Sequence, residues 1–255
     1  MANDSLAVEN LTSTAMPLER QAESVDNPRV GLQRRWLGGV HPGYIALALI
    51  LAVFPLTNPA PYAVTLVTQI LVFSVFTMSL DLLLGYVGLP SFGHAAFLGM
   101  GAYAAAVLSV RLGISNLGVA LLGALALSSI GALILGILAL RTSGVYFLML
   151  TLAFAQIVAA AAQNWKPVTG GDNGLPGVKS PDLFVPGWQV GNGVPFYFLA
   201  LGVAVVCFFL LFRIVHSPFG RALIGIHQNE VRMRALGYNV ALYRLAAFWI
   251  GGVFA

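Results

Sequence analysis

Long runs without a charged residue dominate the pattern of this chain. No Asp, Glu, Lys or Arg occurs in residues 42–80, 82–110, 112–140, 142–165 or 183–212. Each run is long enough for a helix of about 20 residues, the length that crosses the hydrocarbon core of a bilayer. The runs are continuously apolar, whereas a barrel strand alternates apolar and polar residues. The pattern therefore predicts an all-α, polytopic transmembrane helix bundle.

The apolar runs also predict how the chain is organised. We place spans at about 36–56, 62–84, 94–110, 116–140, 143–165 and 195–213, with a seventh starting near 242. The seventh run has only about half the residues that a crossing needs, so we expect the C-terminus to be truncated. Residues 1–35 are polar and lack the apolar core of a signal peptide. We expect a flexible N-terminal tail over 1–35 and a transmembrane domain over 36–255.

Composition and charge support a membrane location and suggest an orientation. Hydrophobic residues make up 58% of the 255 residues and charged residues 9%. With a cytoplasmic N-terminal tail, the external segments hold only Arg111, Lys166 and Lys179 of the 13 basic residues, as the positive-inside rule requires. This rule explains the net charge of +4 better than a nucleic-acid partner, which needs a clustered basic face. The single cysteine, Cys207, lies in an apolar run and excludes an intrachain disulfide.

One polar segment interrupts the apolar pattern near the end of the chain. Residues 217–239 read SPFGRALIGIHQNEVRMRALGYN. Ser217, followed by proline, predicts a helix start, and Gly237 predicts a helix stop. Glycines inside the segment favour two short helices over one. Apolar residues recur at helical spacing, so the segment is amphipathic and either lies on the lipid surface or docks a cytoplasmic partner.

Three separated stretches of the chain resemble one family. SPFGRALIGIHQNEVRMRALGYNVALYRLAAFWIGGVFA is similar to the cytoplasmic segment and following span of LivM-type permeases, the membrane subunits of branched-chain amino acid ABC importers. SLDLLLGYVGLPSFGHAAFLGMGAYAAAVL resembles the glycine-rich signature of that family, and VTGGDNGLPGV its external loop. The resemblance covers about residues 40–255, with the three motifs in the family's order.

The resemblance implies a function and a set of partners. It implies a permease subunit in the bacterial inner membrane that pairs with a homologous permease subunit, cytoplasmic ATPase subunits and a periplasmic substrate-binding protein. The implied substrates are branched-chain, hydrophobic amino acids, with urea or short amides as an alternative. We expect no cofactor, metal or catalytic residue in this chain, since the partner ATPase subunits would use the ATP.

The resemblance also implies that residues 217–239 form the coupling helix that contacts an ATPase subunit. The residues that we assign to this contact are Arg221, His227, Glu230, Arg232, Arg234 and Gly237. The chain departs from the family's pattern at His227, where arginine is common. The glutamate-alanine-alanine signature of other ABC importers is also missing, because valine and arginine follow Glu230.

A second group of residues marks a candidate translocation path. Glycine and proline here favour a broken helix that frames the path, or close packing through small-residue faces. For Asp81 we expect one of two roles: a structural or interfacial role, or a role in gating or proton linkage. His94 is expected to form a hydrogen bond at the start of a helix rather than to relay protons. The candidates are Asp81, Gly85, Gly88, Gly93, His94 and Gly99, with Asp81 and Pro90 departing from the family's pattern.

The segment 166–194 is rich in turn-forming residues. Its candidate residues are Gly170, Gly171 and Asn173, which either receive a substrate-loaded binding protein or merely connect two spans. The chain has no Walker A, HExxH, CxxC or GxSxG motif, so the sequence does not support an enzyme. The rival from another class is a secondary transporter or channel, which would depend on Asp81 and an ion gradient.

Overall fold

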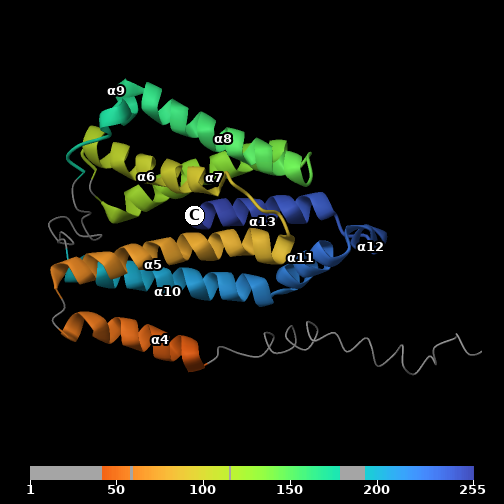
Figure 1. Ribbon diagram of the computed structural model, residues 1–255, viewed down its shortest axis with the longest axis horizontal. Coiled ribbons are helices and arrows are strands. Elements are labelled where there is room, and N and C mark those ends of the chain that lie inside the picture. The colour runs from red at the N-terminus through yellow and green to blue at the C-terminus, as the bar shows by residue number, and fades with distance from the viewer. Residues whose placement is uncertain (1–41, 58–59, 115, 179–192) are drawn as a thin grey trace, which may run out of the picture. The chain divides into compact units, whose positions relative to one another are not determined.

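The computed structural model describes residues 42–57, 60–114, 116–178 and 193–255 of the chain. Over these ranges the chain forms helices and no strand, which confirms the predicted all-α fold (Figure 1). The tail predicted for residues 1–35 lies outside the described residues. The elements, with η for 3-10 and π-helices, are α4 (Pro42–Val53), η1 (Phe54–Thr57), α5 (Pro61–Asp81), η2 (Leu82–Val87), α6 (His94–Arg111), α7 (Leu117–Ala139), α8 (Val145–Asn164), α9 (Lys166–Thr169), η3 (Gly171–Asn173), α10 (Val194–His216), α11 (Pro218–Gln228), α12 (Glu230–Ala235) and α13 (Val240–Phe254).

Four helices in the described part of the chain are long and apolar enough to cross a membrane. They are α5 with its continuation η2, α7, α8 and α10. The shortest, α8, has 20 residues and is therefore about 30 Å long, the thickness of a hydrocarbon core. The shorter helices α4, α6 and α13 fall within or beside the remaining predicted spans, and α6 matches its span, 94–110, to within one residue. The chain is thus a multi-pass membrane protein.

The contacts of the chain divide it into two units after Ala48. Of the first unit, the structure describes only residues 42–48, the first turns of α4. The second unit, Leu49–Ala255, has one large core to which η2, α6, α7, α8, α10, α11 and α13 all contribute buried apolar side chains. Phe248 of α13 lies at its centre and meets Phe97 and Phe147 edge-on, with ring centroids 5.8 and 6.1 Å apart. This geometry is the one that aromatic rings prefer in protein cores.

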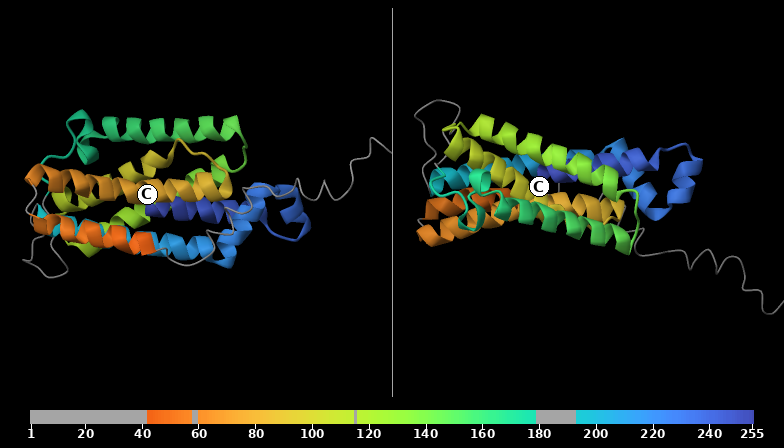
Figure 2. Two further views of the ribbon diagram at one scale, coloured as in Figure 1. Left: turned by 60° about the horizontal axis from the view of Figure 1, so that its bottom comes forward. Right: turned by 90° about the horizontal axis from the view of Figure 1, so that it is seen from above.

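Neighbouring helices in the second unit pack in pairs. α6 lies along α7, α13 lies along α7, and α10 lies along α5 (Figures 1 and 2). The α6 and α7 backbones approach closely at Gly101, where a methyl group would lie 3.2 Å from Ser128 Oγ. The α5 and α10 pair has its own buried cluster, in which the Tyr197 hydroxyl donates to the Leu51 carbonyl oxygen at 2.6 Å. A small residue of α6 thus forms a close helix contact, as the predicted packing through small-residue faces requires.

Two loops lie at opposite ends of the second unit. Figures 1 and 2 show α11 and α12 at the end where α10 stops and α13 starts, and α9 at the other end, after α8. The length of the helices therefore separates the polar segment 217–239 from residues 166–178, the described part of the segment 166–194 apart from its last two residues. The predicted assignment of these loops to opposite sides of a membrane is compatible with this arrangement.

Candidate docking segment and helix break

The polar segment after α10 folds as two short helices, as its glycines predict. α11 starts at Ser217, whose Oγ accepts a hydrogen bond from the Gly220 N–H at 3.4 Å. α12 ends at Gly237, where φ is +85°. There the Tyr238 N–H donates to the Met233 carbonyl and the Gly237 N–H to the Arg234 carbonyl, a Schellman motif. The predicted helix start and stop are both confirmed.

Asn229 separates the two helices, a role that the sequence analysis missed. Its backbone is extended, with φ −157° and ψ 98°, so the helix cannot continue through it. Its side-chain oxygen accepts from the Arg232 N–H at 2.9 Å and caps the start of α12. The signal for this cap was present in the sequence, because asparagine is one of the preferred N-cap residues. One residue thus ends α11 and starts α12.

The two helices differ in how they are built into the protein. α11 carries Leu223 and Ile226, which are fully buried against the core. α12 has no buried residue. The exposed apolar side chains on it and just after it are Val231, Leu236 and Tyr238, with 77%, 66% and 41% of their surface accessible. α11 is therefore anchored, while α12 presents apolar and basic side chains together.

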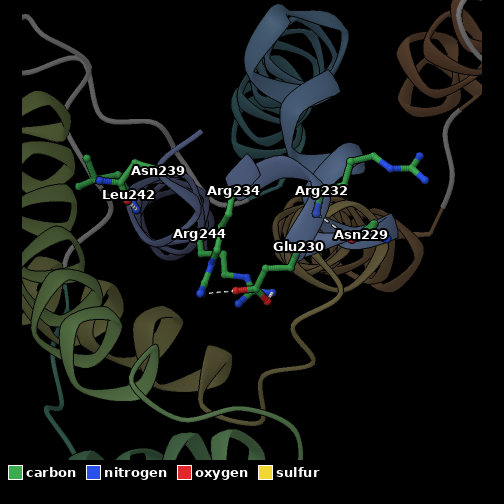
Figure 3. Close-up of polar contacts among 7 residues, drawn as sticks. All are labelled: Asn229, Glu230, Arg232, Arg234, Asn239, Leu242 and Arg244. Atoms are coloured by element: carbon green, nitrogen blue, oxygen red, sulfur yellow. Dashed lines mark hydrogen bonds and ion pairs between the residues drawn. The ribbon is translucent and has the colours of Figure 1, made fainter. Parts of the chain in front are cut away.

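An ion-pair cluster fixes α12 to α13. Glu230 accepts from Arg234 at 2.5 Å and from Arg244, on α13, at 2.8 Å (Figure 3). The Arg234 pair is mostly exposed and contributes little, whereas the Arg244 side chain is 23% exposed and is less screened by water. The Arg232 side chain points away from this cluster (Figure 3). Glu230 thus has an intramolecular role, and Arg244 belongs to the site although the sequence analysis did not select it.

A π-helix breaks the long span before α6. Residues 82–87 continue α5 as η2, and Gly88 ends it with φ +75°. The Leu83 carbonyl accepts from both the Gly88 and Leu89 N–H groups. π-helical turns are rare and occur frequently at functional sites. The predicted helix break is therefore present.

Asp81 and Gly85 lie next to each other at this break. Asp81 is the last residue of α5 and is exposed. Its Oδ1 lies 2.7 Å from the place that a methyl group on Gly85 would occupy. The glycine therefore leaves room for the carboxylate. This neighbouring placement joins two residues of the predicted path.

Gly93 and Gly99 differ in their surroundings. A methyl group on Gly93 would lie 2.6 Å from the Thr151 carbonyl oxygen of α8. The neighbouring Phe92 N–H donates to Thr151 Oγ1 at 3.2 Å. Around Gly99, by contrast, no described atom lies within 4 Å of such a methyl group. Close packing therefore applies to Gly93, while the face of Ala95 and Gly99 has no close helix contact among the described residues.

His94 forms a hydrogen bond, as expected for a residue at a helix start, and its partner lies on another helix. His94 starts α6, but its Nε2 lies 2.8 Å from Ser79 Oγ of α5, so the hydrogen bond crosses between helices. The ring is buried and packs edge-on against Phe97 and at a tilt against Phe76. The loop brings His94 back to α5, so the ring is turned into the core rather than towards its own helix start.

The turn after α8 is held by its own backbone. Gly170 has φ +80°, and a methyl group there would lie 1.9 Å from the Gly174 carbonyl oxygen. A methyl group on Gly171 would lie 3.0 Å from the Gln163 carbonyl oxygen. Asn173 is exposed. Both glycines are therefore required by the turn itself, and Asn173 alone of the three candidates presents a free surface position.

The two predicted groups of residues meet at one point. The His227 ring of α11 lies against Gly88, with Cδ2 2.8 Å from the place of a methyl group on that glycine. Arg221, Arg232 and Arg234 are exposed on residues 217–239, which we call the docking segment. Among the described residues, no three His, Cys, Asp or Glu side chains gather closely enough to hold a metal ion.

These features define a polytopic helical membrane protein with a broken span and an exposed docking segment. The chain belongs to the family described as "Branched-chain amino acid transport system / permease component", which matches residues 62–255. It is similar to the high-affinity branched-chain amino acid transport system permease protein LivM of Salmonella typhimurium, strain LT2, with 28% identity over 214 residues. It is also similar to the protein of the same name from Escherichia coli K12, with 27% identity over 236 residues.

The coverage of these similarities is unequal. The aligned regions cover 76% and 83% of this chain but only 50% and 55% of the two relatives. The chain thus spans about half the length of the curated relatives that it matches. No solved structure matches the chain.

Proposed function

We propose that this chain is a membrane-spanning permease subunit of an ATP-driven importer for branched-chain amino acids. Its family and its two relatives support this substrate class. The chain is a transport component, and separate cytoplasmic subunits hydrolyse the ATP. A homologous permease subunit and a periplasmic substrate-binding protein complete the complex in the bacterial inner membrane. The N-terminus and the α11–α12 segment face the cytoplasm.

The exposed surface of α12 is the observation that carries this proposal. A short helix without any buried residue presents Val231, Leu236 and Arg232 between two apolar helices. Protein interfaces have an apolar core and are enriched in arginine relative to the rest of the surface. A helix lying on lipid would turn its apolar side chains towards the membrane, whereas α12 is tied to α13 through Glu230 and Arg244. This surface therefore fits a cytoplasmic protein partner.

The helix break supports a role in translocation. Irregular backbone inside a membrane is tolerated where protein or water covers it. Broken helices often frame the substrate site of a transporter. In this chain the break comprises η2 and the residues that lead to α6, with the exposed side chain of Asp81 directly before it and that of Phe92 near its end. We place the substrate path beside this break.

Substitutions on α12 test the docking surface. Val231→Glu or Arg232→Glu in the full chain should lower co-purification of the ATPase subunits at least tenfold, because each puts a negative charge into the contact. Neither side chain is buried, so the thermal stability of the chain should not change. Asn173→Glu, an equally exposed change on the other loop, is the matched control. Unchanged co-purification in both α12 variants would contradict docking at this surface.

Transport assays on the same complex distinguish two alternative functions. Transport of urea or a short amide would keep the ATP requirement and change only the substrate. A secondary transporter would ignore ATP and follow an ion gradient, and Asp81→Asn would then abolish the coupling to that gradient. This second alternative depends on a carboxylate that ions can reach. Asp81 is the candidate, because it is exposed at the end of α5.

A further inference from the structure

The docking segment touches the helix break through one side chain. Three ring atoms of His227, namely Cδ2, Nε2 and Cγ, lie 2.8, 2.9 and 3.1 Å from the place of a methyl group on Gly88. His227 is in the last turn of α11, and Gly88 is the residue that ends η2. The two residues are far apart in the sequence, so this contact is created by the fold alone.

Glycine is required on the η2 side of the contact for two independent reasons. Its φ of +75° lies in the left-handed region, which L side chains rarely adopt. A β-carbon there would also lie within 3 Å of the His227 ring, so the ring would have to shift. The ring therefore rests directly on the backbone that terminates the π-helix.

The docking segment reaches the same break by a second route. Glu230 of α12 is paired with Arg244 of α13. Further along α13, a methyl group on Gly251 would lie 3.2 Å from Leu83 Cδ1 and 3.4 Å from His94 Cε1. α13 thus lies against η2 and the start of α6. Contacts therefore connect the docking segment to both sides of the break, and the His227 contact of α11 is the direct one.

The geometry points to the His227–Gly88 contact as the joint that transmits movement of the docking segment to the π-helical break. This inference rests on the proposed function, since it takes partner binding at α12 as the source of the movement. His227 is accordingly a positioning residue that acts through Gly88. π-helical turns are rare and occur frequently at functional sites, and in this account a displacement at Gly88 changes the hydrogen-bond register of η2. Such a change alters the position of α6 relative to α5.

A reversible cross-link tests this inference. The chain has one cysteine, so Cys207→Ala gives a cysteine-free background. Gly88→Cys with His227→Cys should form a disulfide, because His227 Cγ, which is bonded to the β-carbon of that residue, lies 3.1 Å from the place of a β-carbon on Gly88. Loss of two free thiols, scored by maleimide-polyethylene glycol labelling on a gel, reports the bond. Gly88→Cys and His227→Cys alone are the controls for the effect of each substitution.

The functional readout uses vesicles that contain the complete complex with its binding protein. ATP-dependent uptake of labelled leucine should fall at least tenfold on oxidation of the double variant, and dithiothreitol should restore it to the reduced level. Uptake that stays unchanged after complete oxidation would overturn the inference, because a joint that moves cannot work when locked. Failure of the disulfide to form, while Gly88→Cys and His227→Cys alone keep wild-type uptake, would overturn it as well, because two residues that are in contact should then cross-link.

Failure of the proposed function gives a different pattern. In that case the wild-type complex itself takes up no leucine. The inference is then decided by the rate of disulfide formation in the assembled complex, with ATP and vanadate or without nucleotide. A rate that changes severalfold supports a moving joint, and an equal rate in both states overturns it.

Discussion

The contact between Gly93 and α8 gives the sharpest prediction for a single substitution. In Gly93→Ala the added methyl group would lie 2.6 Å from the Thr151 carbonyl oxygen, whereas ordinary contact begins at 3.4 Å, so the α8 backbone must retreat by about 0.8 Å. Thr151 is fully buried and has little room to move. Overpacking of this kind costs about 1–3 kcal/mol. The retreat also strains the Phe92 hydrogen bond to Thr151, which is worth about 1 kcal/mol.

We therefore expect Gly93→Ala to lower the free energy of unfolding by about 2–3 kcal/mol. Gly99→Ala is the matched control, because the same methyl group meets no described atom within 4 Å. Alanine is also the better helix former by about 1 kcal/mol, so this variant should be as stable as the wild type or slightly more stable. Denaturant titration in mixed micelles, followed by tryptophan fluorescence, measures both. Equal stability of the two variants would refute the close approach of the loop to α8.

Three further substitutions test other contacts. Ser79→Ala removes the hydrogen bond to the buried His94 ring and should cost about 1–3 kcal/mol in the same titration, with an unchanged value counting against that bond. Gly170→Ala should lower the thermal midpoint of the purified protein, because φ is +80° and the turn has no room for a side chain, whereas Asn173→Ala should not; equal midpoints would contradict the described turn. Tyr197→Phe should cost about 1 kcal/mol on unfolding, since it loses a 2.6 Å hydrogen bond, and no loss would place its hydroxyl elsewhere.

The helices were predictable because their signals are local. Continuous apolar runs fix the existence of membrane helices without any knowledge of their neighbours. Ser217 and Gly237 act within one turn of their own helices, so the start of α11 and the end of α12 follow from the sequence. The π-helical form of η2 was not predictable, because no residue type marks that register.

The contacts within the site depend on the fold and were not predictable. Gly93 and Gly99 are the same residue type in the same motif, yet only Gly93 approaches another backbone. Glu230 was selected for a partner contact, but its carboxylate is paired with Arg244 on the next helix. His227 was selected for the same contact, and its position against Gly88 was not foreseen. Sequence spacing gives the face of one helix, whereas the partner of that face is set by how separate helices pack.

The central claim is that this chain works in an ATP-driven importer. The most direct test is uptake of labelled leucine and labelled urea by membrane vesicles that contain the full chain with its neighbouring subunits and binding protein. ATP is supplied or withheld, and the ion gradients are collapsed. We predict leucine uptake that requires ATP and survives collapse of the gradients. Uptake that follows the gradients and ignores ATP would contradict the account and would favour a secondary transporter that depends on Asp81.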